Sequence, residues 1–169
     1  MKKLFIRLTS ASFVVVMLLV TLAVPAFAAT HAPVRSFTQQ GAMTAVCNDD
    51  DATCDGQNPF ATVGPDGQPC ATDGQQPIAV ADNALGEQVA LFYSQNCETN
   101  WSVYQGEAQG IVNANVQRLN SDGSITEYDT TVESSFGAIS PMVFAPVLTA
   151  RACGSENNDP ATSLCTGFF

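Results

Sequence analysis

Cationic side chains are scarce in this sequence. Six lysines and arginines and one histidine stand against sixteen aspartates and glutamates. Both lysines and one arginine fall within the first seven residues, so the rest of the chain keeps three arginines and a formal net charge of −13, three minus sixteen. Such a chain repels phosphate groups, which excludes nucleic-acid binding and disfavours anionic lipid surfaces. The charge favours solubility outside the cell.

The groups that most enzymes use for nucleophilic catalysis are also missing. His31 is the single imidazole and lies in a segment that we expect to be loose, so a Ser-His-Asp triad is not expected. No lysine follows Lys3, which excludes Schiff-base chemistry, and no G-x-x-x-x-G-K loop is present to hold phosphate. We therefore expect no enzyme activity. A carboxylate-dependent hydrolase is the catalytic alternative that the composition leaves open.

The N-terminus has the features of a secretory signal peptide. Two lysines begin the chain before an uncharged apolar run over residues 13–20, and the small residues Ala26 and Ala28 follow the run. This order predicts a signal peptide over residues 1–28 that is removed on export, so the protein is expected to be secreted. Neither a cysteine nor a stop-transfer charge follows directly, so we expect no lipid anchor and no stable membrane anchor.

All six cysteines follow the expected signal peptide, and an even number in an oxidising compartment predicts three disulfides. No C-x-x-C pair occurs, so zinc is a poor alternative and no metal site is expected at these thiols. Cys70 comes just before an expected strand and Cys97 just after that strand's hairpin partner, which favours a bridge between them. Two local bridges complete the favoured scheme: Cys47–Cys54 and Cys153–Cys165. The main alternative joins Cys54 to Cys70 and Cys97 to Cys153.

Two cysteines have similar surroundings. Cys54 and Cys153 are each followed by a glycine-bearing polar stretch, an Asx-Pro step, Ala-Thr and a further cysteine. Because Asx-Pro pairs start turns, the similarity indicates either an internal repeat or two loops with the same turn chemistry.

Short strands separated by turns make up most of the remaining sequence. One apolar–polar alternation reaches Asn120-Ser121-Asp122-Gly123, a hairpin turn, and returns. Pro146 marks an edge or a bulge, and no sustained helical periodicity occurs. The expected strands are 77–81, 88–94, 100–105, 111–119, 124–132 and 141–152. We expect an all-β fold, a small antiparallel barrel or sandwich of about six strands.

The expected domain organisation follows from these patterns. Residues 29–46 are mixed and polar and predict a flexible N-terminal arm. Residues 47–169 are expected to form a single disulfide-braced β domain. Its first part, 47–76, is a long loop-rich region with Asp-Gly turns and little apolar surface, so disulfides must hold it.

Two groups of side chains are candidates for binding. Four carboxylates crowd one loop and offer hard oxygen ligands for calcium, although the spacing of an EF-hand is missing and a solvated acidic loop is the alternative. An aromatic platform for a ligand is the second candidate, with the hydrophobic core as the alternative that we favour for the tryptophan. The residues are Asp49, Asp50, Asp51 and Asp55 for calcium, and Tyr93, Trp101 and Tyr104 for the platform.

Several motifs resemble those of DUF2690, a bacterial family of unknown function. Cys54-Asp55-Gly56-Gln57-Asn58-Pro59 is similar to the opening of that family, and Val89-Ala90-Leu91-Phe92-Tyr93-Ser94 with Cys97 and Trp101 is similar to its core. Pro141-Met142-Val143-Phe144 and Ala150-Arg151-Ala152-Cys153 resemble its closing segment. The chain departs from the pattern by an insertion between Thr62 and Cys70, by Phe92 where the family often has arginine, and by a tail that carries Cys165.

The resemblance implies an extracytoplasmic sensing or binding module. Members occur as secreted proteins and on the outer side of membrane-anchored helix-turn-helix regulators, and no activity is assigned to them. We therefore expect a secreted, non-catalytic binding or envelope-associated module whose partner is an extracellular protein, a glycan or a small molecule. A protease inhibitor that presents the tethered loop Val63 to Cys70 is the alternative, and the carboxylate-dependent hydrolase is a further one.

Overall fold

A computed structural model of the chain describes residues 45–106, 110–134, 137–146, 149–157, 159 and 162–169. Contacts divide the chain into two units, 1–36 and 37–169, and every described residue belongs to the second. The expected signal peptide and residues 29–44 of the expected arm lie outside the described residues. The last two residues of that arm, Ala45 and Val46, form a short strand.

Strands dominate the described residues, which confirms the all-β prediction. The six long strands are β3 (Pro77–Asp82), β4 (Gln88–Ser94), β5 (Thr99–Gln105), β6 (Gly110–Leu119), β7 (Ile125–Ser134) and β10 (Ala150–Glu156). The two-residue strands are β1 (Ala45–Val46), β2 (Thr62–Val63), β8 (Ala138–Ile139), β9 (Val143–Phe144) and β11 (Leu164–Cys165). The helical segments are α1 (Asp51–Cys54) and the 3₁₀ turn η1 (Cys70–Thr72). In this part of the chain no helix is both long and apolar enough to cross a membrane.

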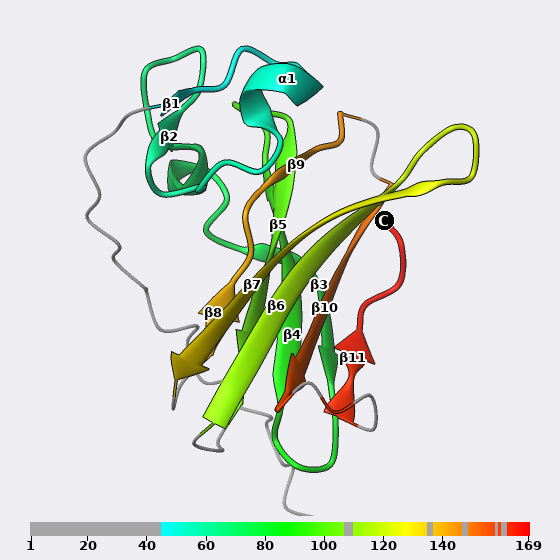
Figure 1. Cartoon of the computed structure of the whole chain (residues 1–169). Helices are drawn as coiled ribbons and strands as arrows, with labels where there is room; N and C mark the ends of the chain where they lie inside the picture. Colours follow the sequence, from blue (N-terminus) through cyan, green and yellow to red (C-terminus); the bar gives the residue numbers. More distant parts are fainter. Residues whose placement is uncertain (1–44, 107–109, 135–136, 147–148, 158, 160–161) are drawn as a thin grey trace, which may run out of the picture. The chain divides into compact units, whose positions relative to one another are not determined.

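Two antiparallel sheets form a sandwich (Figure 1). One sheet has the order β11-β10-β6-β7, and the other has the order β3-β4-β5-β8, with β9 also paired to β5. Side chains from both sheets meet in one apolar core, which includes Val89, Leu91, Tyr104, Val112, Ala114, Val116, Ala150 and Ala152. A separate parallel pair, β1 and β2, lies in the loop-rich N-terminal region.

The β6–β7 hairpin follows directly from its sequence. Val112, Ala114 and Val116 are buried, whereas the polar residues between them are only partly buried, as the alternation predicts. At the turn, Gly123 adopts a φ of 83°, a conformation that favours glycine. The Asn120 side chain donates hydrogen bonds to the hydroxyls on the returning strand and so fixes the register.

The pair β4–β5 is buried on both faces. The inner face carries core residues, and on the outer face the rings of Phe92 and Trp101 stack with centroids 5.7 Å apart. Gly74 lies against this stack, because a Cβ at that position would be 2.2 Å from Cη2 of Trp101. Trp101 and Tyr104 are 1% and 0% exposed, so they belong to the core and not to an exposed platform.

The segment expected as one broken strand over 141–152 is divided between the two sheets. Val143–Phe144 pairs with β5, whereas Ala150–Glu156 pairs with β6. Proline cannot donate a ladder hydrogen bond, and Pro146 lies where the chain leaves the first sheet. The sequence therefore indicated the interruption correctly but not the change of sheet, and it did not indicate β8.

The three disulfides join Cys47 to Cys54, Cys70 to Cys97 and Cys153 to Cys165, which is the favoured scheme. The similar stretches after Cys54 and Cys153 have different structures. Cys54 ends α1, whereas Cys153 lies within β10 opposite Cys165. The described parts of the two stretches therefore give no support for a structural repeat.

The packing between the sheets predicts that Gly154 tolerates no side chain. A Cβ there would lie 2.3 Å from Cδ2 of Tyr104, so Gly154→Ala should lower the free energy of unfolding by about 1–3 kcal/mol. Chemical denaturation checks this value, with Ser155→Ala on the neighbouring residue as the control. Equal denaturation midpoints for the two variants would contradict the close packing of Gly154 against Tyr104 between the two sheets.

Candidate functional site

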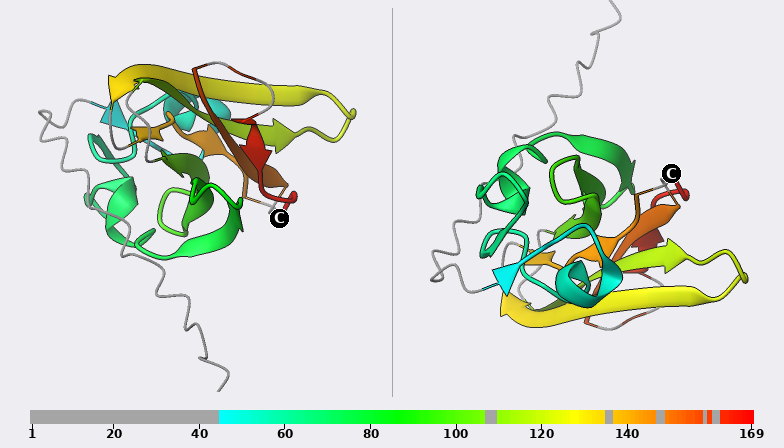
Figure 2. Two further views of the ribbon diagram at one scale, coloured as in Figure 1. Left: turned by 90° about the horizontal axis from the view of Figure 1, so that it is seen from below. Right: turned by 90° about the horizontal axis from the view of Figure 1, so that it is seen from above.

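The loop-rich region 45–76, here called the cap, lies over one end of the sandwich (Figure 2). The sulfur atoms of Cys47, Cys70 and Cys97 lie within 4.8 Å of one another, so two bridges pack together inside the cap. Gly56 N donates to Met142 O over 2.9 Å, and Met142 N donates to Gln57 O over 2.8 Å. The cap is therefore joined to the strand segment 142–144 by backbone hydrogen bonds.

Arg118 of β6 makes the main polar connection between the sandwich and the cap. Its Nη1 donates to Oδ1 of Asp51 over 2.7 Å and to the carbonyl oxygen of Phe144, and its Nη2 lies 3.7 Å from Oδ2 of Asp55. The side chains of Arg118 and Asp55 are only 14% and 9% exposed, so this pair is shielded from solvent. A shielded pair is costly to break, because either partner alone would be an uncompensated charge.

Asp55 completes the connection through its second oxygen. Its Oδ1 accepts a hydrogen bond from Phe144 N, and the Tyr128 hydroxyl donates to Oδ2 over 3.5 Å. Burial raises the pKa of the Asp55 carboxyl, and the Phe144 N–H and Arg118 offset only part of that rise. Burial and the Asp55 charge likewise raise the pKa of the Tyr128 phenol.

Three of the four aspartates considered for calcium have protein partners, either in the cap or on Arg118 of β6. Asp50 is the N-cap of α1, where Oδ1 accepts from Thr53 N over 2.7 Å, and hydrogen bonds from Thr53 lower the pKa of Asp50. Asp51 and Asp55 contact Arg118, and Asp49 has a φ of 57° on the exposed turn before the helix. These contacts explain Asp50, Asp51 and Asp55 as structural groups of the cap. Calcium binding at this loop stays a prediction.

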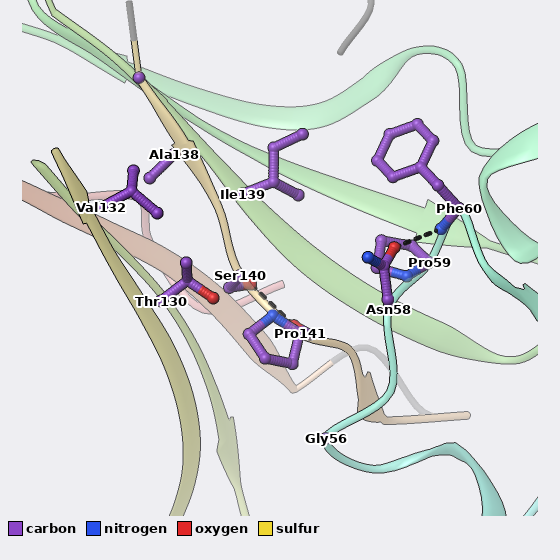
Figure 3. Close-up of a pocket in the computed structure, with 11 residues that line it drawn as sticks. Gly56, Asn58, Pro59, Phe60, Thr130, Val132, Ala138, Ile139, Ser140 and Pro141 are labelled. Atoms are coloured by element: carbon purple, nitrogen blue, oxygen red, sulfur yellow. Dashed lines mark hydrogen bonds between the residues drawn. The ribbon is translucent and has the colours of Figure 1, made fainter. Parts of the chain in front are cut away.

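A groove of about 350 Å³ lies where the cap meets the edges of both sheets. Figure 3 shows the cap loop Gly56–Phe60 on one side and β7 and β8 on the other. The lining residues are Gly56, Asn58, Pro59, Phe60, Thr130, Val132, Gly137, Ala138, Ile139, Ser140 and Pro141. Most of these are apolar, as is typical of ligand pockets, whose volumes are about 300–1,000 Å³.

Sheet topology explains why the groove exists. β7 ends one sheet and β8 ends the other, so the sandwich is open between these two edge strands. The cap loop closes the groove at one end, and Asn58 Oδ1 holds that loop by accepting from Phe60 N over 2.9 Å. Edge strands present backbone groups that another chain can pair with.

The polar groups of the groove are an amide and hydroxyls. Among its described lining residues no side chain is ionisable. The hydroxyl of Ser140 is buried, accepts from Ser102 N over 2.9 Å and donates to Pro141 O over 2.8 Å. It is therefore used in holding β8 against β5. The groove can bind an apolar group and orient it through a few neutral hydrogen bonds.

The loop considered for protease inhibition is a tight hairpin. Val63 and Pro69 form an antiparallel β-bridge, and Gly67 N donates to Gly64 O over 2.9 Å. At the tip, the Asn96 side-chain amide donates a hydrogen bond to Oδ1 of Asp66. An inhibitor loop that enters a protease cleft is extended, so this geometry does not favour the prediction.

Sequence reasoning did not identify the residues of the groove. They come from the loop 56–60 and from the distant stretch 130–141, and Phe60, Val132 and Ile139 look in the sequence like ordinary apolar positions. One signal was available, because Gly56, Asn58 and Pro59 belong to the first motif of the family resemblance.

Taken together, these features define a disulfide-braced β-sandwich with a mostly apolar groove beside its cap. The family model "Protein of unknown function (DUF2690)" matches residues 52–153, and the chain belongs to this family. No curated protein and no solved structure matches the chain. The matched region contains the whole groove, whereas β11 and Cys165 lie beyond it.

Arg118 is predicted to be the side chain on which attachment of the cap depends most. Arg118→Met should lower the free energy of unfolding by about 3 kcal/mol, because it leaves the shielded carboxylate of Asp55 without its cation. Arg151→Met is the matched control, since Arg151 packs over the Phe168 ring and should cost about 1 kcal/mol or less. Equal losses measured by denaturation would show that the Arg118 contacts carry no special weight.

Asp55 is predicted to make stability depend on pH. Because its pKa is raised above 3.8 in the folded protein, the stability it contributes is fully present below 3.8 and is lost as pH rises through the raised pKa. The difference in unfolding free energy, wild type minus Asp55→Asn, should therefore fall with rising pH and then level off. Denaturation at several pH values measures it, and a difference that grew with pH would show that Arg118 outweighs burial.

Proposed function

We propose that this chain is a secreted, non-catalytic binding module and that the groove between the cap and the edge strands β7 and β8 takes its ligand. The observation that carries the proposal is the position of the groove, which the family's first motif and closing segment line together. The three disulfides indicate an oxidising, extracellular setting, which supports a role outside the cell.

An extended segment of another protein is the ligand class that fits best. The groove offers apolar contacts for a side chain, and the two edge strands beside it can pair with an extended backbone. Its volume, about 350 Å³, is at the small end for ligand pockets and suits one part of a larger partner. A glycan would instead favour exposed aromatic rings, whereas Trp101 and Tyr104 are buried.

The negative charge of β7 indicates which peptide segments of a partner would bind. Along β7 the side chains of Glu127, Asp129 and Glu133 are exposed on the face opposite to the groove-lining positions Thr130 and Val132. Carboxylates in such a row speed the approach of a basic partner and repel an acidic one. The preferred ligand is therefore an extended peptide with an apolar side chain flanked by arginine or lysine.

Absence of catalysis is part of the proposal. The groove lining has neutral polar groups, and the Ser140 hydroxyl is used in the structure. The tight hairpin at Val63–Pro69 supports a binding role over protease inhibition.

The proposal predicts opposite effects for two neighbouring threonines. Thr130 lines the groove and Thr131 points to the other face of β7, so Thr130→Arg should block binding and Thr131→Arg should not. NMR titration of each variant tests this difference in binding. The ligands are short peptides that each bear one apolar residue flanked by arginines, and oligosaccharides serve as the comparison. We expect peptide-induced chemical shift changes at residues 56–60 and 138–141. Thr130→Arg should lower the affinity obtained from these changes at least tenfold.

Three results would contradict the proposal. One is binding that perturbs only residues outside the groove, and another is equal affinity in the two arginine variants. Turnover of a peptide or glycan by the purified protein would contradict the non-catalytic part. The melting temperatures of both variants must match that of the wild type for the comparison to count.

A further inference from the structure

Two buried glutamates occupy the end of the sandwich opposite the cap. Glu87 directly precedes β4 and is 4% exposed, and Glu156 ends β10 and is 7% exposed. Glu156 pairs with the core residue Val112, and Glu87 alternates with the core residue Val89, so both side chains face the space between the sheets.

Tyr104 lies between the strands that carry these glutamates. Its ring packs over Gly154, two residues before Glu156 on the same face of β10. A Cβ on Gly106 would be 2.0 Å from Oε1 of Glu156 and 3.3 Å from Cε1 of Tyr104, so the carboxylate and the tip of the ring lie against the same backbone. The absence of a side chain at Gly106 leaves the carboxylate its space.

One carboxylate oxygen of this cluster lacks a partner among the described residues. Oε1 of Glu156 is buried there without a hydrogen bond, and the Tyr104 hydroxyl has the Glu87 carboxylate as its nearby polar group. The charges of both Glu156 and Glu87 act on the Tyr104 phenol, so the three groups form one cluster, and a phenol is an uncharged oxygen at neutral pH. Asn83 holds the other side of the cluster by donating to Oε2 of Glu87. A buried polar atom without a partner indicates a water or an ion at that place.

No cation of the described residues balances the two carboxylates. Arg118 is at the cap end with Asp51 and Asp55, and Arg151 donates to Gln117. Buried carboxylates are paired or coordinate a metal, because isolated burial of the charge costs several kcal/mol or more. An ion at that place is therefore positively charged.

We propose that Glu87, Glu156 and Tyr104 bind a divalent cation, with calcium as the ion of choice, at the end of the sandwich away from the cap. The carboxylates and the neutral phenol supply hard oxygen ligands, which suit calcium, and its flexible coordination tolerates an irregular set. Two carboxylates match its charge. This site is separate from the acidic loop of the cap, and Glu156 lies beyond the region that the family model matches.

Terbium luminescence on the full oxidised protein tests the site directly, because terbium replaces calcium and a nearby tyrosine sensitises its emission. We expect sensitised emission that excess calcium displaces, and a rise in melting temperature of about 5 °C or more in saturating calcium over EDTA. Glu156→Gln and Glu87→Gln should each weaken binding at least tenfold. Tyr104→Phe should reduce the emission, because it removes the sensitising phenol.

Asp49→Asn in the exposed acidic loop is the matched control and should bind as the wild type does. Circular dichroism and melting in EDTA establish that each variant is folded. Absence of emission and of any calcium-dependent shift in melting temperature would overturn the proposal. Emission that Asp49→Asn abolishes and both glutamine variants retain would also overturn it, and would place the ion in the cap.

Discussion

The guanidinium of Arg118 holds the cap to the sandwich, and the groove depends on that attachment. It is contributed by β6, the middle of one sheet, and it reaches Asp51, Asp55 and the carbonyl of Phe144. These partners belong to α1, to the turn after it and to β9. Because α1 is only four residues long, packing alone gives it little stability, so the bridge from Cys47 to Cys54 and the Arg118 contacts must fix it.

Attachment of the cap places the first family motif beside two unpaired sheet edges. Asp55 binds the backbone of Phe144, and the next residues, Gly56 to Phe60, then line the groove opposite β7 and β8. The same short segment therefore both attaches the cap and lines the groove in which we propose that the ligand binds. The family match begins in α1 and ends in β10. The glutamate cluster lies at the opposite end, with Glu87 and Tyr104 inside the matched region and Glu156 beyond it.

Local patterns predicted the hairpins, and nonlocal packing decided the remainder. The β6–β7 hairpin was predictable because alternation and an Asp-Gly turn act over neighbouring residues. The Cys70–Cys97 bridge followed from strands that end side by side. The groove and the glutamate cluster were not predictable, because each joins segments of both sheets. Glu87 and Glu156 look like surface residues in the sequence, and only their register with core strands buries them.

Amide hydrogen exchange of Gly56, Met142 and Phe144 is the most direct measurement of the central claim, that cap and sandwich are one cooperative unit. These N–H groups make the bonds that join the two parts. The account predicts that they exchange as slowly as amides of β5 and β6 and that Arg118→Met speeds their exchange selectively. Fast exchange in the wild type, at the rate of exposed turns, would show a cap that detaches freely and a groove without a fixed wall.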